Sequence, residues 1–338
     1  MIAADQADAA WSTDEEVRAL LDPHEISEGP HATPPQPGES TPATAAESAF
    51  RHSGWQNRRV ATAEALGLAG ATPPTLLRFN RCGSAAWVMQ DTRDTTRLRV
   101  QCERCRNRWC EACARERRSL IQMNLAKCLP KARLRFMTLT LKSNDDAPEV
   151  CVRRLYNCFR NLRQRAKIKK LLTGGIAFLE LTYSPERRQY HPHLHIIWQG
   201  HYVAHAMLRN EWLSVTQDSY IVDVRSLPRP DHAVSYVAKY ATKSIGPSIW
   251  RDAAAFVQVI RGLARVRTLF TWGSWRGFKL LSPPEDDTAW QTLGKLDDIA
   301  RRAAGGDEDA RVIMRLLNRY IPGNENADER LLALDDST

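Results

Sequence analysis

Two alternating stretches joined by a short polar link constrain the fold of this chain more than any other part of its sequence. Residues 176–183 and 190–198 are rich in residues that favour strands, and the link between them carries Pro185. This pattern predicts a β-hairpin whose strands pair directly across the turn. A turn centred near Glu186 and Arg187 would place Glu180 opposite His193.

The remaining pattern places other strands and helices around this hairpin. A helix over 149–172 carries the basic run 163–170, and Gly174-Gly175 is expected to end it. The other expected elements are a helix at 115–128, a strand at 134–141, a helix at 205–216, a strand at 220–224, a helix at 231–243 that Asp231 could cap, and an amphipathic stretch at 299–320. This order predicts an α+β fold with a mainly antiparallel sheet and helices packed on it.

The second strand of the hairpin carries three alternating histidines. Because side chains alternate along a strand, His191, His193 and His195 share one face, whereas Leu194 and Ile196 point to the other face and into a core. Two imidazoles spaced two residues apart on a rigid strand can bind one cation together. The pattern therefore favours a metal site over histidines that merely pack.

Glu180 is the expected third ligand of that metal. The predicted register puts it opposite His193 and on the same face, although a slip of one residue would turn it away. A carboxylate beside two imidazoles suits a Mg²⁺ or Mn²⁺ ion that polarises a phosphate better than it suits a closed structural zinc site.

The expected helix at 231–243 has an aromatic and cationic face. Tyr236, Lys239, Tyr240 and Lys243 stand at helical spacing and therefore share one side. A phenol is a weak nucleophile at neutral pH, and a nearby cation either lowers its pKa or stabilises the phosphoryl charge that develops. Lys239 and Lys243 can supply that charge, although two tyrosines four residues apart also occur as ordinary packing.

Three motifs, in this order, resemble those of the HUH endonucleases, a superfamily that includes rolling-circle replication initiators of plasmids and small phages. Phe136-Met-Thr-Leu-Thr-Leu141 resembles the first motif, a core strand; His193-Leu-His195 resembles the metal-binding signature; and Tyr236-Val-Ala-Lys-Tyr240 resembles the catalytic motif in its two-tyrosine form. The motifs span residues 136–243, about a third of the chain.

The resemblance implies an HUH nuclease domain with a palm like that of RNA-recognition motifs. It implies that His193, His195 and a nearby acidic residue, here Glu180, bind the metal, while Tyr236 or Tyr240 attacks the scissile phosphate. Attack yields a 5′-phosphotyrosine and a free 3′-OH, which keeps the phosphodiester energy for rejoining and leaves a primer. Such an initiator nicks and rejoins single-stranded or hairpin DNA at an origin, and it works with a host helicase and polymerase.

A cluster of thiols precedes these motifs. Two close pairs and one upstream residue followed by a glycine make five candidate metal ligands: Cys82, Cys102, Cys105, Cys110 and Cys113. Tetrahedral Zn²⁺ takes four thiolates, so a zinc site with one spare cysteine is expected, with an iron–sulfur cluster as the alternative. Arginines alternate with Trp109 in this segment. The module therefore either binds phosphate groups, while the Trp109 ring stacks or packs, or has a purely structural role.

The charge of the chain is unevenly distributed. Its net charge is +9, yet residues 1–50 hold ten acidic side chains against Arg18 alone, so the remainder carries about +18. This remainder predicts a polyanionic partner, namely DNA. The proline-rich acidic segment cannot bury enough apolar surface to fold. The chain has neither a long apolar run nor a signal peptide at its start, so we expect no membrane association and a cytoplasmic location.

The sequence thus predicts four parts. These are a disordered acidic tail at 1–50, a cysteine-rich zinc-binding module with a connecting helix at 51–128, a nuclease domain at 129–283 and a helical C-terminal tail at 284–338. Two other functions compete with replication initiation. One is a tandem-tyrosine transposase of a rolling-circle insertion element, and the other is a non-catalytic zinc-dependent DNA-binding regulator. The presence of both histidines and both tyrosines argues against the regulator.

Overall fold

The computed structural model describes residues 47, 50–52, 54–129, 134–227, 245–283 and 285–318. Backbone contacts divide the chain into two compact units, which we describe separately. The histidine unit is the described part of 68–70 and 115–283, and the cysteine unit is the described part of 47–67, 71–114 and 285–318. Each unit has its own sheet and its own hydrophobic core.

A five-stranded antiparallel sheet forms the centre of the histidine unit and confirms the predicted α+β class. Its strand order is β6-β3-β5-β4-β7. The long hairpin lies in the middle of the sheet, so β3 pairs with one of its edges and β7 with the other. The strands are β3 (Leu134–Thr140), β4 (Leu172–Ser184), β5 (Gln189–Gly200), β6 (Val222–Leu227) and β7 (Leu269–Gly273).

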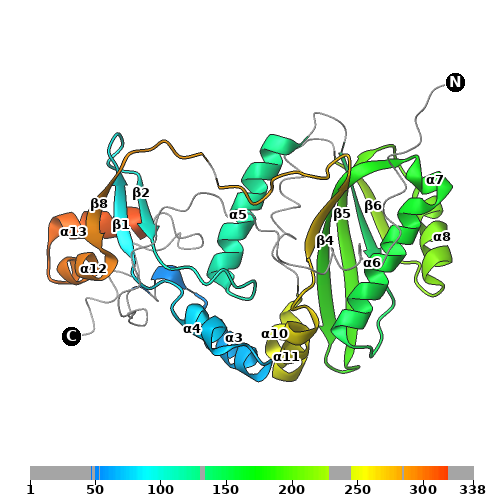
Figure 1. Ribbon diagram of the computed structural model, residues 1–338, viewed down its shortest axis with the longest axis horizontal. Helices are drawn as coiled ribbons and strands as arrows, with labels where there is room; N and C mark the ends of the chain where they lie inside the picture. The colour runs from blue at the N-terminus through cyan, green and yellow to red at the C-terminus, as the bar shows by residue number, and fades with distance from the viewer. Residues whose placement is uncertain are drawn as a thin grey trace. The chain divides into compact units, whose positions relative to one another are not determined.

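Helices α6 (Pro148–Gln164) and α8 (His205–Thr216) cover one face of this sheet (Figure 1). Pro148 starts α6 at a position where its missing N–H is not needed. One stripe of α6 is apolar and buried, and the helix contacts both β5 and α8. The short helix α10 (Pro247–Arg251) contacts β4, and α11 (Ala253–Gly262) packs against α6.

The opposite face of the sheet has an apolar half and a polar half. In the apolar half, Phe136, Phe178 and Ile197 pack in one core cluster with Ile121 and Leu125 of α5 (Glu111–Cys128). Further along the same strands, the polar half carries threonines, histidines and a glutamate. The polar half is thus built on a rigid sheet whose neighbouring half is a packed core.

The sequence misplaced the junction between α6 and the hairpin. We predicted one helix over 149–172 that ends at Gly174-Gly175, but α6 ends at Gln164 because Arg165 turns to an extended ψ of 128°. The short α7 (Ala166–Lys169) follows. Both glycines lie inside β4, where a Cβ on Gly175 would be 2.3 Å from the carbonyl oxygen of Ile197. These glycines permit the close approach of two strands instead of ending a helix.

A three-stranded antiparallel sheet, β2-β1-β8, forms the cysteine unit together with four helices (Figure 1). The core between this sheet and helices α12 and α13 includes Val88, Leu98, Ile299 and Leu317. The elements are α3 (Gln56–Leu68), α4 (Pro73–Asn80), β1 (Trp87–Asp91), β2 (Leu98–Gln101), β8 (Trp290–Lys295), α12 (Leu296–Ala304) and α13 (Glu308–Asn318).

The C-terminal residues are part of this unit. We expected a separate helical tail at 284–338, but β8 pairs along its length with β1. The amphipathic stretch predicted at 299–320 consists of two helices, because α12 ends before Gly305 and Gly306 adopts a positive φ of 95°.

Two predicted features lie outside the described residues. They are the acidic segment, of which the structure describes Glu47 and Phe50, and the helix predicted at 231–243. Among the helices that the structure does describe, none is both long enough and apolar enough to cross a membrane.

Candidate functional site

Two threonines of β3 pair directly with two histidines of β5. Thr138 lies opposite His195, and Thr140 lies opposite His193. In each pair the threonine Oγ1 is 3.0 Å from the histidine Nδ1. We call these four residues the threonine–histidine ladder. Because β3 holds each imidazole through Nδ1, the Nε2 atoms face the other neighbouring strand, β4.

Glu180 of β4 pairs with His193 in the backbone register, as the sequence predicted. Its carboxylate, however, contacts the next histidine along the strand, with Oε2 2.7 Å from His195 Nε2. The side chains of His195 and Glu180 are 7% and 9% exposed. A carboxylate buried this deeply requires a polar partner, and the imidazole of His195 provides it.

His193 and His191 extend the row of imidazoles. The His193 ring lies 6.3 Å from the ring of His195 and almost parallel to it, and its Nε2 is 3.4 Å from Thr182 Oγ1 of β4. The His191 ring lies 4.4 Å from that of His193, and burial lowers the pKa of His191. The three histidines share one face as predicted, but their ligand atoms do not converge on one point together with Glu180. In the described parts of the chain, the cysteines alone form such a converging group.

The predicted nucleophilic residues lie outside the described part of the chain. They are Tyr236, Lys239, Tyr240 and Lys243, and the structure describes the chain up to Leu227 and again from Ile245.

The chain resumes directly beside the polar half of the sheet. Ile245 forms a parallel bridge with Leu181 of β4, and the Gly246 N–H donates to the Leu181 carbonyl over 2.7 Å. A Cβ on Gly246 would lie 3.2 Å from Thr182 Cγ2, so this position needs a small residue. Ile245 and Gly246 are therefore held against Leu181, the residue next to Glu180.

Four of the five candidate cysteines come together in the cysteine unit. The ligand atoms of Cys82, Cys105, Cys110 and Cys113 all lie within 4.8 Å of one another. The Cys82 sulfur is 3.8 Å from that of Cys110 and 3.6 Å from that of Cys113. A tetrahedral ion with metal–sulfur bonds of about 2.3 Å places its sulfurs about 3.8 Å apart. The sulfurs already have the spacing that one tetrahedral ion requires.

Hydrogen bonds within the cluster shift the pKa values of its thiols, and Cys102 is not part of the cluster. Hydrogen bonds from the thiol of Cys105, and then from those of Cys110 and Cys113, lower the pKa of Cys82. The Arg51 guanidinium donates to the Cys113 sulfur over 3.5 Å, which also favours a thiolate. Cys102 instead packs against the core of the cysteine unit, so it is the spare thiol.

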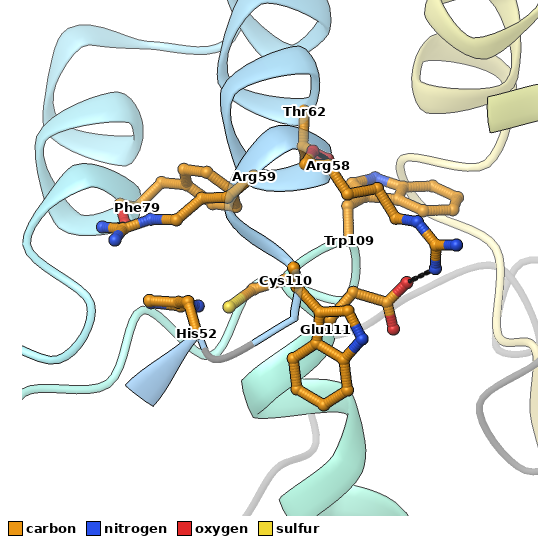
Figure 2. Close-up of a pocket in the computed structure, with 9 residues that line it drawn as sticks. His52, Arg58, Arg59, Thr62, Phe79, Trp109, Cys110 and Glu111 are labelled. Atoms are coloured by element: carbon orange, nitrogen blue, oxygen red, sulfur yellow. Dashed lines mark hydrogen bonds and ion pairs between the residues drawn. The ribbon is translucent and has the colours of Figure 1, made fainter. Parts of the chain in front are cut away.

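Trp109 packs instead of offering a face for stacking. Its side chain is buried, and with Cys110 it lines a small pocket below α3 (Figure 2). Figure 2 shows the Arg58 guanidinium of α3 bound to the Glu111 carboxylate at this pocket. Of the two roles that the sequence left open for this ring, the structure supports packing.

We did not predict Thr138 and Thr140 as site residues, because their motif resembles a core strand. The signal was present as alternation. In Phe136-Met-Thr-Leu-Thr-Leu141 the threonines alternate with buried Met137 and Leu139, just as the histidines alternate with Leu194 and Ile196. Recognising the pairing required the register between β3 and β5, which are separated in the chain by helices α6 and α7 and strand β4.

Comparison with known proteins matches this chain to replication proteins. The chain is 30% identical over 153 residues to "Protein rep" of Streptococcus pneumoniae serotype 2, which covers 43% of this chain and 45% of that protein. It is 29% identical over 158 residues to "Protein rep" of Staphylococcus aureus, which covers 41% of this chain and 69% of that protein. The match thus spans less than half of the streptococcal relative. No solved structure matches the chain.

The family model for the replication protein family Rep_1 matches residues 96–314, more than half of the chain. The matched region contains the threonine–histidine ladder, Glu180 and the predicted tyrosine motif. This chain therefore belongs to the Rep_1 family of replication proteins.

Proposed function

We propose that this protein initiates rolling-circle replication by nicking and rejoining single-stranded DNA at an origin through a 5′-phosphotyrosine intermediate. Membership of the Rep_1 family supports the role in replication. The observation that carries the chemical part of the proposal is the row of His193, His195 and Glu180 on one face of the sheet.

The donor set of this row fits a divalent cation. Imidazole nitrogens and a carboxylate oxygen together suit Mn²⁺ or Mg²⁺, and the Nε2 atoms of both histidines face Glu180 or its neighbour Thr182. His193, His195 and Glu180 would hold this ion. When bound, the ion would supply charge that polarises the scissile phosphate.

Tyr236 or Tyr240 is the proposed nucleophile. Tyr240 precedes Ile245 by five residues, and a chain of that length spans at most about 18 Å. Because Ile245 is bridged to Leu181 beside Glu180, connectivity supports a tyrosine that reaches the polar half. Lys239 and Lys243 would stabilise the charge that develops on the phosphate.

The chemistry of the step is a phosphoryl transfer without net hydrolysis. The phenolic oxygen forms a bond to phosphorus and loses its proton, while the bond from phosphorus to the 3′ oxygen breaks and that oxygen gains a proton. The free 3′-OH can then prime synthesis. The later attack of a 3′-OH on the phosphotyrosine reverses the step and rejoins the strand. A second tyrosine can cut while the first still holds DNA.

The cysteine cluster is the proposed zinc site. Its four sulfurs match the spacing around one tetrahedral ion, whereas a cluster of several irons would hold them farther apart. Zinc here would connect the Cys82 turn, the Cys105 loop and the start of α5. Its role is therefore structural.

We expect the protein to act on DNA in the cytoplasm together with a host helicase and polymerase. The transposase alternative shares the metal and tyrosine motifs. The relatives found are replication proteins, which favours the initiator.

A covalent adduct tests the proposal directly. The full chain is incubated with Mn²⁺ and labelled single-stranded oligonucleotides that tile the DNA flanking its gene, and trypsin fragments are then analysed by mass spectrometry. We expect one oligonucleotide to leave a nucleotide on the peptide that contains Tyr236 or on the peptide that contains Tyr240, which tryptic cleavage after Lys239 separates. Cleavage without any tyrosine adduct, or an adduct elsewhere, would reject the assignment.

A further inference from the structure

The threonine–histidine ladder repeats one contact twice. Thr138 and Thr140 are two residues apart on β3, and each lies opposite its histidine on β5. Both Oγ1–Nδ1 distances are 3.0 Å. Thr140 and His195 are buried, and their partners His193 and Thr138 are half-buried, so both contacts are partly shielded from water. The sheet register therefore presents each imidazole with a hydroxyl on its Nδ1 side.

A hydroxyl is suited to this place because it can both donate and accept. Neutral imidazole carries its proton on one nitrogen, and a cation can bind only the other. When His195 Nε2 donates to Glu180, the Thr138 hydroxyl can donate to Nδ1. With a cation on Nε2, the proton would reside on Nδ1, and the same hydroxyl oxygen would accept a hydrogen bond from Nδ1–H. A carboxylate in this position would favour the second state alone.

We propose that Thr138 and Thr140 are positioning residues that hold the ring orientation of the metal-binding His195 and His193 and accept a hydrogen bond from Nδ1–H when Nε2 binds the cation. This inference rests on the proposed function, because it requires that the two histidines bind the cation through Nε2. It assigns a role to the motif Phe136–Leu141 beyond that of a core strand. Neither threonine touches the substrate in this role.

Metal affinity of the full chain tests the inference. Mn²⁺ binding is measured by electron paramagnetic resonance for Thr138→Val and Thr140→Val, which preserve the shape of the side chain but remove the hydroxyl. Loss of a partner on the far side of a ligating histidine typically weakens metal binding by roughly 10- to 100-fold. We expect that loss for each valine variant, and we expect Thr138→Ser and Thr140→Ser to retain affinity within about threefold.

A matched control tests whether replacing any strand threonine with valine weakens Mn²⁺ binding. Thr271 lies on β7, opposite Ile176 and two strands away from β5, so Thr271→Val should bind Mn²⁺ like the unchanged protein. A second readout is the nitrogen NMR spectrum of the histidines with Mg²⁺ bound. His193 and His195 should show the proton on Nδ1, and at the same Mg²⁺ concentration the valine variants should show less of this metal-bound form.

The outcomes separate the inference from the proposed function. If His195→Ala abolishes Mn²⁺ binding while the valine variants bind normally, the threonines do not position the ligands and the metal site stands. If the serine variants bind as poorly as the valine variants, the threonines act through packing and the inference fails. If His193→Ala and His195→Ala both leave Mn²⁺ affinity unchanged, the proposed metal site itself is wrong.

Discussion

Single side chains in this protein differ in role even where the sequence makes them look alike. Cys102 and Cys105 are three residues apart, yet Cys105 belongs to the four-cysteine cluster and Cys102 packs against a core. The rings of Tyr190 and Tyr183 pack on the hairpin at a distance of 5.0 Å and a tilt of 39°, while Tyr236 and Tyr240 are the proposed nucleophiles. Substitution of neighbouring residues of the same type can therefore distinguish their roles.

Replacement of the tyrosines should separate cutting from binding. Tyr236→Phe and Tyr240→Phe should each reduce nicking of a supercoiled plasmid that carries the origin, and the double variant should abolish it, because phenylalanine has no nucleophilic oxygen. Binding to the same DNA, measured by gel shift, should remain within about twofold, since one hydroxyl is a small part of a contact made largely with phosphates. Full nicking by the double variant would end the tyrosine assignment.

Serine replacement should distinguish a metal ligand from the spare thiol. Cys105→Ser should lose the zinc equivalent that the unchanged protein carries after purification, because three thiolates and a hydroxyl bind Zn²⁺ much more weakly. Cys102→Ser should keep the full equivalent. Metal content is measured by mass spectrometry of the acid-digested protein. Equal loss from the two variants would show that the metal uses a different set of cysteines.

At the scale of elements, close approach between strands decides where glycine is required. The β4–β5 hairpin carries Glu180, His193 and His195, and its far end is formed around Gly175, which lies against Ile197 and Trp198. A helix glycine faces no such restriction. Gly67 lies in α3 with nothing within 4 Å of an added Cβ.

Alanine substitution of these two glycines should change the free energy of unfolding in opposite directions. Gly175→Ala should lower the free energy of unfolding by about 3 kcal/mol, because its Cβ would clash with backbone that cannot move away. Gly67→Ala should raise that free energy by about 0.5–1 kcal/mol, since alanine favours a helix and meets no neighbour. Urea unfolding followed by circular dichroism measures both. A neutral Gly175→Ala would mean that the hairpin is packed less closely than described.

For the whole molecule, the division into two units has thermodynamic consequences. Each unit has a separate hydrophobic core, and the cysteine group lies in one of them. The charge of the chain is also divided, with an acidic first segment and a basic remainder.

Removal of the metal should destabilise one unit selectively. We expect calorimetry to show two unfolding transitions, since separate cores need not unfold together. A zinc chelator should lower the temperature of one transition and leave the other in place, because a structural zinc contributes directly to folding. Cys102→Ser serves as the control with unchanged transitions. A single transition that shifts as a whole would contradict the independence of the units.

DNA affinity should fall steeply with salt. The residues after position 50 carry about +18, and each neutralised phosphate releases counterions on binding. If six to ten phosphates are contacted, the affinity should fall by roughly 10³- to 10⁵-fold between 50 and 200 mM salt. Fluorescence anisotropy with a labelled single strand measures it. A flat response would show that the basic surface is not the binding face.

Periodicity in the sequence determined the α+β class, the hairpin, the shared face of the histidines and the pairing of Glu180 with His193. These features depend on contacts close in the chain, where alternation and a short turn leave few alternatives. The same patterns misplaced Gly174 and Gly175, because the close approach of β4 and β5 outweighs the tendency of glycine to end a helix.

The tertiary structure alone decided the features that join distant segments. It selected Cys82 over Cys102 as the fourth thiol, paired β8 with β1, and brought Thr138 and Thr140 to the Nδ1 atoms of His195 and His193. It also directed the Glu180 carboxylate to His195, which lies two residues along β5 from His193, the backbone partner of Glu180. The local sequence determines the hydrophobic periodicity of each element. The residues that pair across the sheet are determined only when the elements pack together.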